Sequence, residues 1–216
     1  MSRPLLALLL AAPVAAGASA AHARSAFDGF YAGASVAMTD LKGPATSTLA
    51  GSTSTQRLNG DGHAFGAYTG FGWSLGPAYL GAEANAELDN ARADTIAGVS
   101  TIRIGTEESY GIGGRAGISL SDYVADVLLY GKASRQWTDL KIAQTLASSS
   151  LGNETSNATA WRYGGGVEVA FSSDMWVRLE YTRTNYDPIT VATGTLTSSA
   201  DLRTDQYRIG IAFRFF

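Results

Sequence analysis

Apolar and polar residues alternate with a period of two over most of the chain after residue 23, which predicts β-strands. Eight alternating segments can be separated, and none of them has the spacing of an amphipathic helix. The predicted strands cover residues 29–39, 63–75, 78–89, 107–120, 126–137, 160–171, 175–184 and 204–216.

The links between these segments are long and short in strict alternation. The long links are 40–62, 90–106, 138–159 and 185–203, and the short ones are 76–77, 121–125 and 172–174. Outer-membrane barrels have short periplasmic turns and longer extracellular loops. Greek-key sandwiches do not share this regularity, because their connections cross between sheets. The spacing therefore predicts an eight-stranded antiparallel up-and-down barrel with both chain ends on the short-turn side.

Alternation alone does not say which row of side chains faces inward. Over residues 78–89, Leu80, Ala82 and Ala84 share one face, while Glu83 and Glu87 share the other. The apolar row points inward in water and outward in lipid.

Aromatic residues gather near both ends of the predicted strands, as at the two interfaces of a membrane. Those near the short links are Phe30, Phe71, Trp73, Tyr123, Phe171, Trp176, Phe213 and Phe215, and those near the long links are Phe65, Tyr110, Trp137, Trp161, Tyr181 and Tyr207. Lipid is therefore predicted to bathe the apolar row.

The polar row carries charges of both signs among many glycines. Its charged members are Glu83, Glu87, Arg115, Lys132, Arg162, Glu168, Arg178, Glu180, Arg208 and Arg214. An eight-stranded barrel is only wide enough for side chains to fill. We therefore predict a charge network inside a filled, all-β transmembrane barrel, since unpaired charges there would be costly.

The first residues have the features of a secretory signal peptide. Arg3 precedes an apolar run over 5–16, and small-x-small cleavage sites end at Ala20 and Ala23. The run is too short to span a membrane as a helix. We expect a cleaved signal peptide over 1–23 and a barrel domain over 24–216, with Ala20 as the second cleavage candidate.

Composition excludes several kinds of chemistry. The 216 residues include no cysteine and two histidines, which excludes disulfides, thiol catalysis and Cys- or His-rich metal sites. The net charge of -3 does not indicate a nucleic-acid partner. Residues 111–116 match a G-x-G-x-x-A dinucleotide fingerprint, but they lie inside a predicted strand instead of opening a helix. We expect no cofactor and no enzymatic activity.

Both ends of the barrel domain resemble a known family. Residues 27–33, Phe-Asp-Gly-Phe-Tyr-Ala-Gly, resemble the Trp-x-Gly-Phe-Tyr-x-Gly opening of small Gram-negative outer-membrane surface antigens, the opacity-protein-like porin family. The end of the chain resembles the family's terminal strand, which the barrel-assembly machinery reads; the residues concerned are Tyr207, Phe213, Phe215 and Phe216. Phe27 replaces the opening Trp, and Phe216 extends one residue past the outward register.

The resemblance implies a structural, surface-exposed protein that displays four long extracellular loops. Its expected partners are outer-membrane lipid with lipopolysaccharide, the assembly machinery during insertion, and an extracellular loop partner that the sequence does not name. Three alternatives remain: a narrow channel for ions or small solutes, an outer-leaflet lipid hydrolase that uses His63, and a soluble periplasmic ligand-binding barrel. The hydrolase would need a nucleophile and an orienting group beside His63.

Overall fold

The computed structural model describes residues 25–49, 52–97, 100–122, 125–146, 149–193 and 196–215. The predicted signal peptide and two of the aromatic residues singled out above, Tyr123 and Phe216, lie outside these ranges. The strands are β1 (Gly29–Leu49), β2 (Ser52–Leu75), β3 (Ala78–Asp89), β4 (Arg92–Ala97), β5 (Ser100–Asp122), β6 (Ala125–Leu146), β7 (Ser149–Ser172), β8 (Met175–Tyr186), β9 (Ile189–Thr193), β10 (Leu196–Ala200) and β11 (Arg203–Arg214).

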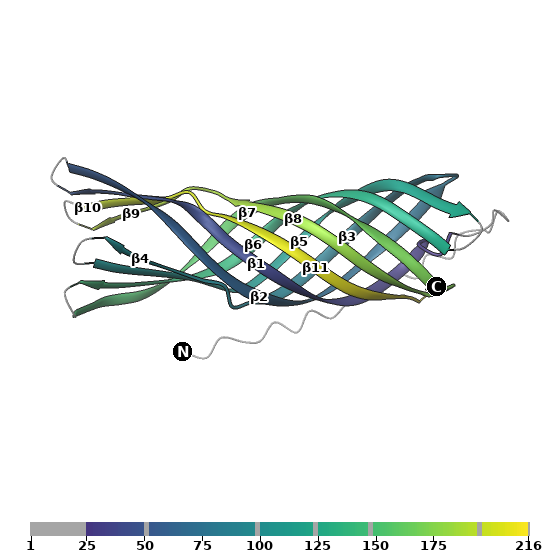
Figure 1. The fold of residues 1–216 in the computed structure, drawn as a ribbon, viewed down its shortest axis with the longest axis horizontal. Coiled ribbons are helices and arrows are strands. Elements are labelled where there is room, and N and C mark those ends of the chain that lie inside the picture. The colour runs from purple at the N-terminus through teal and green to yellow at the C-terminus, as the bar shows by residue number, and fades with distance from the viewer. Residues whose placement is uncertain are drawn as a thin grey trace.

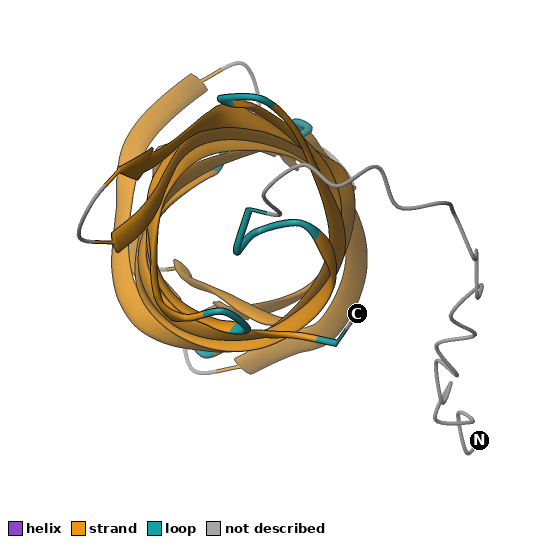
Figure 2. Ribbon diagram, turned by 90° about the vertical axis from the view of Figure 1, so that its right-hand side faces the viewer, coloured by secondary structure: helices purple, strands orange, loops and turns teal. Residues whose placement is uncertain are grey.

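Eight of the described strands form a closed antiparallel ring. Each pairs with the next around the ring in the order β1, β2, β3, β5, β6, β7, β8 and β11, and β11 pairs back with β1 from Tyr31↔Arg214 to Lys42↔Arg203. The ring is seen end-on in Figure 2. The predicted eight-stranded up-and-down barrel is therefore confirmed. Closure leaves no unpaired edge within the ring, as a spanning sheet requires.

The apolar row lies outside and the charged row inside. Leu80 and Leu179 are 52% and 53% exposed on the outer wall, whereas Glu168 and Arg178 are 0% and 1% exposed. Hydrocarbon solvates such an outer wall, and the lumen must pair its own polar groups. No helix among the described residues is long and apolar enough to cross a membrane.

The four long links were predicted to be loops. This prediction is wrong, because most of their residues form strands. The β1–β2 hairpin runs to Leu49 and Ser52, and β4, β9 and β10 lie wholly within links that were expected to be loops. Their Ser/Thr composition misled the interpretation, although β-branched Thr favours strands. Cross-strand hydroxyl pairs support the extension, with Thr46 and Thr48 lying 3.2 and 3.1 Å from Thr55 and Thr53. The long strands protrude as hairpins at the left of Figure 1.

Trp176 does not belong to the outer aromatic row that was predicted near the short turns. It is 1% exposed and lies inside the barrel, because it shares the inward register of Arg178 on β8. By contrast, Phe71 and Phe213 near the short turns, and Trp161 and Tyr207 near the hairpins, are exposed on the outer wall.

Candidate functional site

Glu83 on β3 lies at the centre of the buried charge network. Its carboxylate is 2.8 Å from Arg178 Nη2, 2.8 Å from Lys132 Nζ and 3.4 Å from Arg115 Nη1. Tyr31 also donates its hydroxyl to Glu83 at 2.9 Å. Three cations from three other strands thus meet one carboxylate from β3, which ties distant parts of the ring together.

Two further carboxylates complete this layer. Glu168 accepts from Arg178 Nε at 2.7 Å and lies 2.8 Å from Arg115 Nη2. Glu180 lies 3.3 Å from Lys132 Nζ and accepts the Tyr130 hydroxyl at 2.6 Å. The carboxylates are shared among the cations, so that opposite charges offset one another in a region without bulk water.

A second layer of the network lies closer to the hairpins and is built on Glu87. Its Oε1 lies 2.5 Å from Arg162 Nη1 and 2.7 Å from Arg208 Nη1, and it accepts from Asn85 Nδ2 at 3.2 Å. Arg208 Nε also lies 3.8 Å from Glu180, which connects the two layers.

Aromatic rings cover the guanidinium groups of the first layer. The Cζ of Arg115 is 4.0 Å from the Tyr130 ring centroid, and that of Arg178 is 4.0 Å from the Tyr68 centroid. These cation–π contacts stabilise charges that are already desolvated. Sequence analysis missed these tyrosines as lumen residues, although both share the inward register of the charged row.

Inward glycines make the space that these rings occupy. A Cβ on Gly70 would overlap the Tyr31 hydroxyl, and one on Gly166 would lie 2.8 Å from the Tyr130 hydroxyl. Glycine in a barrel strand therefore marks a close approach by a large side chain from elsewhere in the ring.

The short-turn end of the lumen is closed by an aromatic cluster. The segment before β1 turns into the ring, where it is seen as the teal loop nearest the centre of Figure 2. It buries Phe27, whose ring meets that of Trp176 edge-on at 5.6 Å, and Tyr31 meets Trp176 at 5.5 Å. This inner plug contains Ala26, Phe27, Tyr31, Tyr68, Tyr79, Leu128, Tyr130, Ala170, Trp176 and Ala212.

A second apolar cluster closes the hairpin end. This outer plug contains Leu41, Leu58, Ala158, Ala160, Tyr186 and Leu202. Its three leucines are at most 1% exposed. From the short-turn end to the hairpin end, the interior is thus filled by the inner plug, the two layers of ion pairs and the outer plug.

Arg214 does not join the network that was predicted for it. Its guanidinium lies 2.7 Å from the Asp174 carboxylate and donates to the backbone oxygen of Ser25 at 3.1 Å, both at the short-turn end. The hydrogen bond from Arg214, with a smaller contribution from Ser173, holds the pKa of Asp174 below its ordinary value. The other predicted interior charges all meet in the two layers described above.

The predicted assembly-signal residues lie on the outer wall of β11 and just beyond it. Tyr207, Phe213 and Phe215 are exposed, and the Tyr207 ring lies 5.1 Å from that of Tyr181. Phe216 is not among the described residues. Their outward register leaves these side chains accessible to lipid or to a protein that recognises the terminal strand.

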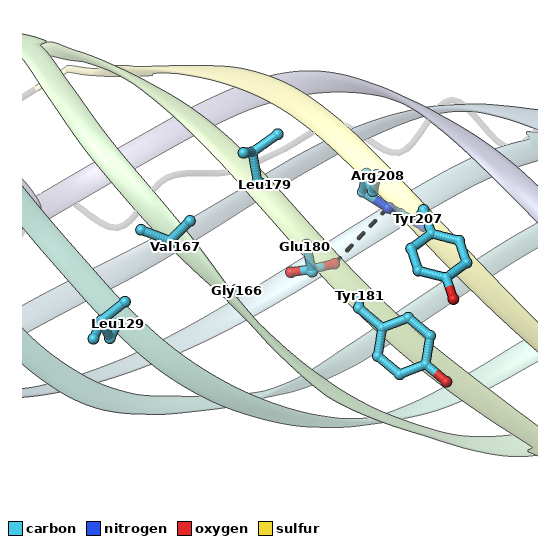
Figure 3. A pocket seen from close by; sticks show the side chains of 8 residues that line it. All are labelled: Leu129, Gly166, Val167, Leu179, Glu180, Tyr181, Tyr207 and Arg208. Carbon is cyan, nitrogen blue, oxygen red and sulfur yellow. Dashed lines mark ion pairs between the residues drawn. The ribbon is translucent and has the colours of Figure 1, made fainter.

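A shallow groove of about 410 Å³ lies on the same wall. Leu129, Val167, Leu179, Tyr181 and Tyr207 line it on the outer wall (Figure 3). The backbone of Gly166 and the buried residues Glu180 and Arg208 complete the lining. The side chains that border the groove on the outer wall are apolar or aromatic, as expected for a wall that is covered by acyl chains.

His63 lies on the exposed outer face of β2. Its backbone nitrogen donates to Asn90 Oδ1 at 2.8 Å, and its backbone oxygen accepts from the Asn90 nitrogen at 3.1 Å. No hydrogen bond to its imidazole is found within the described part of the chain. Over the same residues, no group of acidic, His or Cys side chains could hold a metal ion.

Comparison with known proteins relates most of the chain to outer-membrane proteins. The chain is 28% identical over 174 residues to a 22 kDa outer membrane protein of Rhizobium leguminosarum bv. viciae, covering 76% of this chain and 74% of that protein. Its fold is similar to that of OprG from Pseudomonas aeruginosa, with a TM-score of 0.55, 12% identity and coverage of 88% and 98% of the two chains. Ail of Yersinia pestis has a TM-score of 0.42 at 14% identity, with coverage of 87% and 99%. Residues 6–215 match the outer membrane protein beta-barrel domain family, to which this chain therefore belongs.

Proposed function

We propose that this protein is a non-enzymatic outer-membrane anchor that holds β-hairpins at the cell surface and has a lumen closed to solutes. The single observation that carries the proposal is the filled interior. Two layers of buried ion pairs are enclosed between the inner plug and the outer plug. A barrel with this interior offers its outer wall and its protruding hairpins for contact, and little else.

Two of the three alternatives, the narrow channel and the outer-leaflet hydrolase, gain less support. A channel would require a continuous water path, whereas large side chains such as Trp176, Arg178 and Gln136 fill the lumen at 0–1% exposure. A hydrolase would require a hydroxyl nucleophile and an orienting acid beside His63. The described contacts of His63 involve its backbone instead.

Lipopolysaccharide is the lipid that we propose for the wall below the hairpins. There the Arg135 guanidinium lies 5.5 Å from the Trp161 ring centroid and 2.8 Å from the Asp187 carboxylate. Hydrogen bonds from Thr159 and Arg135 lower the pKa of Asp187. A belt of aromatic and ionic side chains suits the boundary between acyl chains and charged headgroups.

Single-cysteine labelling of intact cells tests which end of the barrel lies outside. The chain has no cysteine, so each introduced thiol is the only one in the variant protein. Thr53→Cys on the β1–β2 hairpin should react with a membrane-impermeant maleimide on whole cells. Ser173→Cys in a short turn should react only after the outer membrane is permeabilised. The reverse pattern would refute surface display of the hairpins.

A further inference from the structure

Beyond the barrel, the described strands diverge into two sheets that are joined only by the short β2–β4 pairing. One contains the outer part of β2, then β1, β10 and β9, and the other contains β4 and the outer parts of β5, β6 and β7. Figure 1 shows the two groups diverging at the left. Each sheet therefore ends in strands that lack a neighbour on one side.

The gap beside β2 begins where β4 leaves it. β4 continues along β2 in the register of β3, which runs from Ala64↔Asp89 to Gly60↔Ala93. It pairs with β2 only at Gly60↔Ala93 and Asp61↔Arg92. Residues 52–59 of β2 consequently pair only with β1 in the described structure.

The register identifies the backbone groups that face this gap. The backbone nitrogen and oxygen of His63 both bond to Asn90, on the β3 side of β2. In an antiparallel ladder, alternate residues direct both backbone groups to the same side. Odd-numbered β2 residues therefore face the gap, namely Thr53, Thr55, Arg57 and Asn59. Their N–H and C=O groups form a row without a strand partner.

This edge has few of the features that usually protect a free strand. Proteins block edges with charged side chains, Pro, bulges or very short strands. Residues 52–59 contain no Pro and a single charged residue, Arg57, and the pairing with β1 runs through them without a register shift. By contrast, β9 is five residues long and directly follows Pro188. The edge of β2 is therefore more suitable for pairing than that of β9.

The side chains along the edge indicate the chemistry of a partner. Thr53, Thr55, Arg57 and Asn59 are exposed, so the outer face of this edge is polar and carries one positive charge. Arg57 lies opposite Pro44 on β1, which offers it no opposite charge. An acidic side chain on an added strand would complement Arg57.

We propose that residues 53–59 of β2 bind an extended segment of a partner polypeptide as an added β-strand, with an acidic side chain of that segment next to Arg57. Main-chain hydrogen bonds would supply the affinity, and the flanking side chains the selectivity. The proposal rests on the surface display argued above. Cysteine labelling tests that display on cells, whereas the peptide assay below uses purified protein, so the two can fail separately.

The test is fluorescence anisotropy with a labelled peptide, Thr-Val-Glu-Val-Thr-Val-Thr, and the full-length barrel folded in detergent. The wild-type protein should bind the peptide. Thr55→Pro removes one N–H from the open edge and should weaken binding by about tenfold or more. Thr55→Ala is the matched control, because it keeps the N–H and should change binding less than twofold. A heat-dependent gel shift verifies that each variant is folded.

Two further arms separate backbone pairing from non-specific adhesion. N-methyl groups on two adjacent central peptide residues block both of its edges and should abolish binding. Arg57→Glu should weaken binding of the acidic peptide and favour the version in which Lys replaces Glu. Absence of binding to the folded wild-type protein, or binding unaffected by N-methylation, would overturn the proposal. Dimerisation of the wild-type protein through this edge, with no peptide bound, would overturn the choice of partner.

Discussion

Glu83 is the residue on which most of the buried cations converge. Its removal would leave Arg115, Lys132 and Arg178 with fewer acceptors in a lumen from which they cannot reach water. Breaking a buried ion pair from one side is costly, because the uncompensated charge remains buried.

We therefore expect Glu83→Gln to lower the free energy of unfolding by about 3–5 kcal/mol. Urea titration of the barrel in lipid vesicles would measure it. Glu108→Gln is the control, because Glu108 is exposed on β5 and should change stability by less than about 0.5 kcal/mol. Equal effects of the two substitutions would contradict the central role of Glu83.

Asp174 predicts a pH dependence at the short-turn end. Since the hydrogen bond from Arg214 lowers its pKa in the folded state, the ionised carboxylate favours folding. This contribution is complete above the ordinary pKa of an unfolded Asp, about 3.9, and disappears as the pH falls through the lowered folded value. The stability difference between wild type and Asp174→Asn should therefore shrink below about pH 4. A difference that grows on acidification would contradict this assignment.

At the scale of elements, β7 shows how a strand is shaped by its neighbours. Its glycine run covers residues 164–166, and a Cβ on Gly164 would overlap the backbone carbonyl oxygen of Tyr181. A Cβ on Gly131 of β6 would instead lie 3.7 Å from the nearest atom, the Gly164 oxygen. Two mid-barrel glycines on adjacent strands thus differ sharply in the space around them.

Gly164→Ala should consequently destabilise the barrel by about 1–3 kcal/mol, because the overlap is with backbone and forces a shift. Gly131→Ala should be tolerated. Urea midpoints for both variants, measured under identical lipid conditions, give the comparison. If both substitutions were tolerated, β7 and β8 would have to move apart at Gly164 at little cost in stability, which would contradict this argument.

Sequence reasoning was sufficient for the ring because the period-two pattern specifies side-chain direction independently of distant contacts. It correctly gave the inward rows of Glu168 and Arg178 and the alternation of long and short links. It failed for the hairpins, where polar Thr on both faces hides the alternation, and pairing with a neighbour decides the structure. It also failed for Arg214. The register of a strand predicts whether a side chain points into or out of the barrel, but it does not predict at which depth along the barrel a long side chain forms its ion pair.

At the scale of the whole molecule, the filled lumen predicts that the protein does not conduct ions. Purified folded protein reconstituted into a planar bilayer should give no discrete conductance steps, because the plugs and ion-pair layers leave no continuous water path through the described interior. A heat-dependent gel shift on the same preparation confirms that the barrel is folded. Reproducible single-channel steps would refute the closed-lumen part of the proposed function.

The β1–β2 hairpin continues its barrel strands without a register shift, and this restricts how this exposed part of the protein can change in length. Adding one residue to a single arm would exchange its inner and outer faces from that point to the tip. Adding two residues to each arm keeps both the faces and the cross-strand partners and moves the tip outward by about 6.8 Å. Variation in exposed length among relatives should therefore occur as balanced insertions near the tips, which leave the spanning region and its charges unchanged.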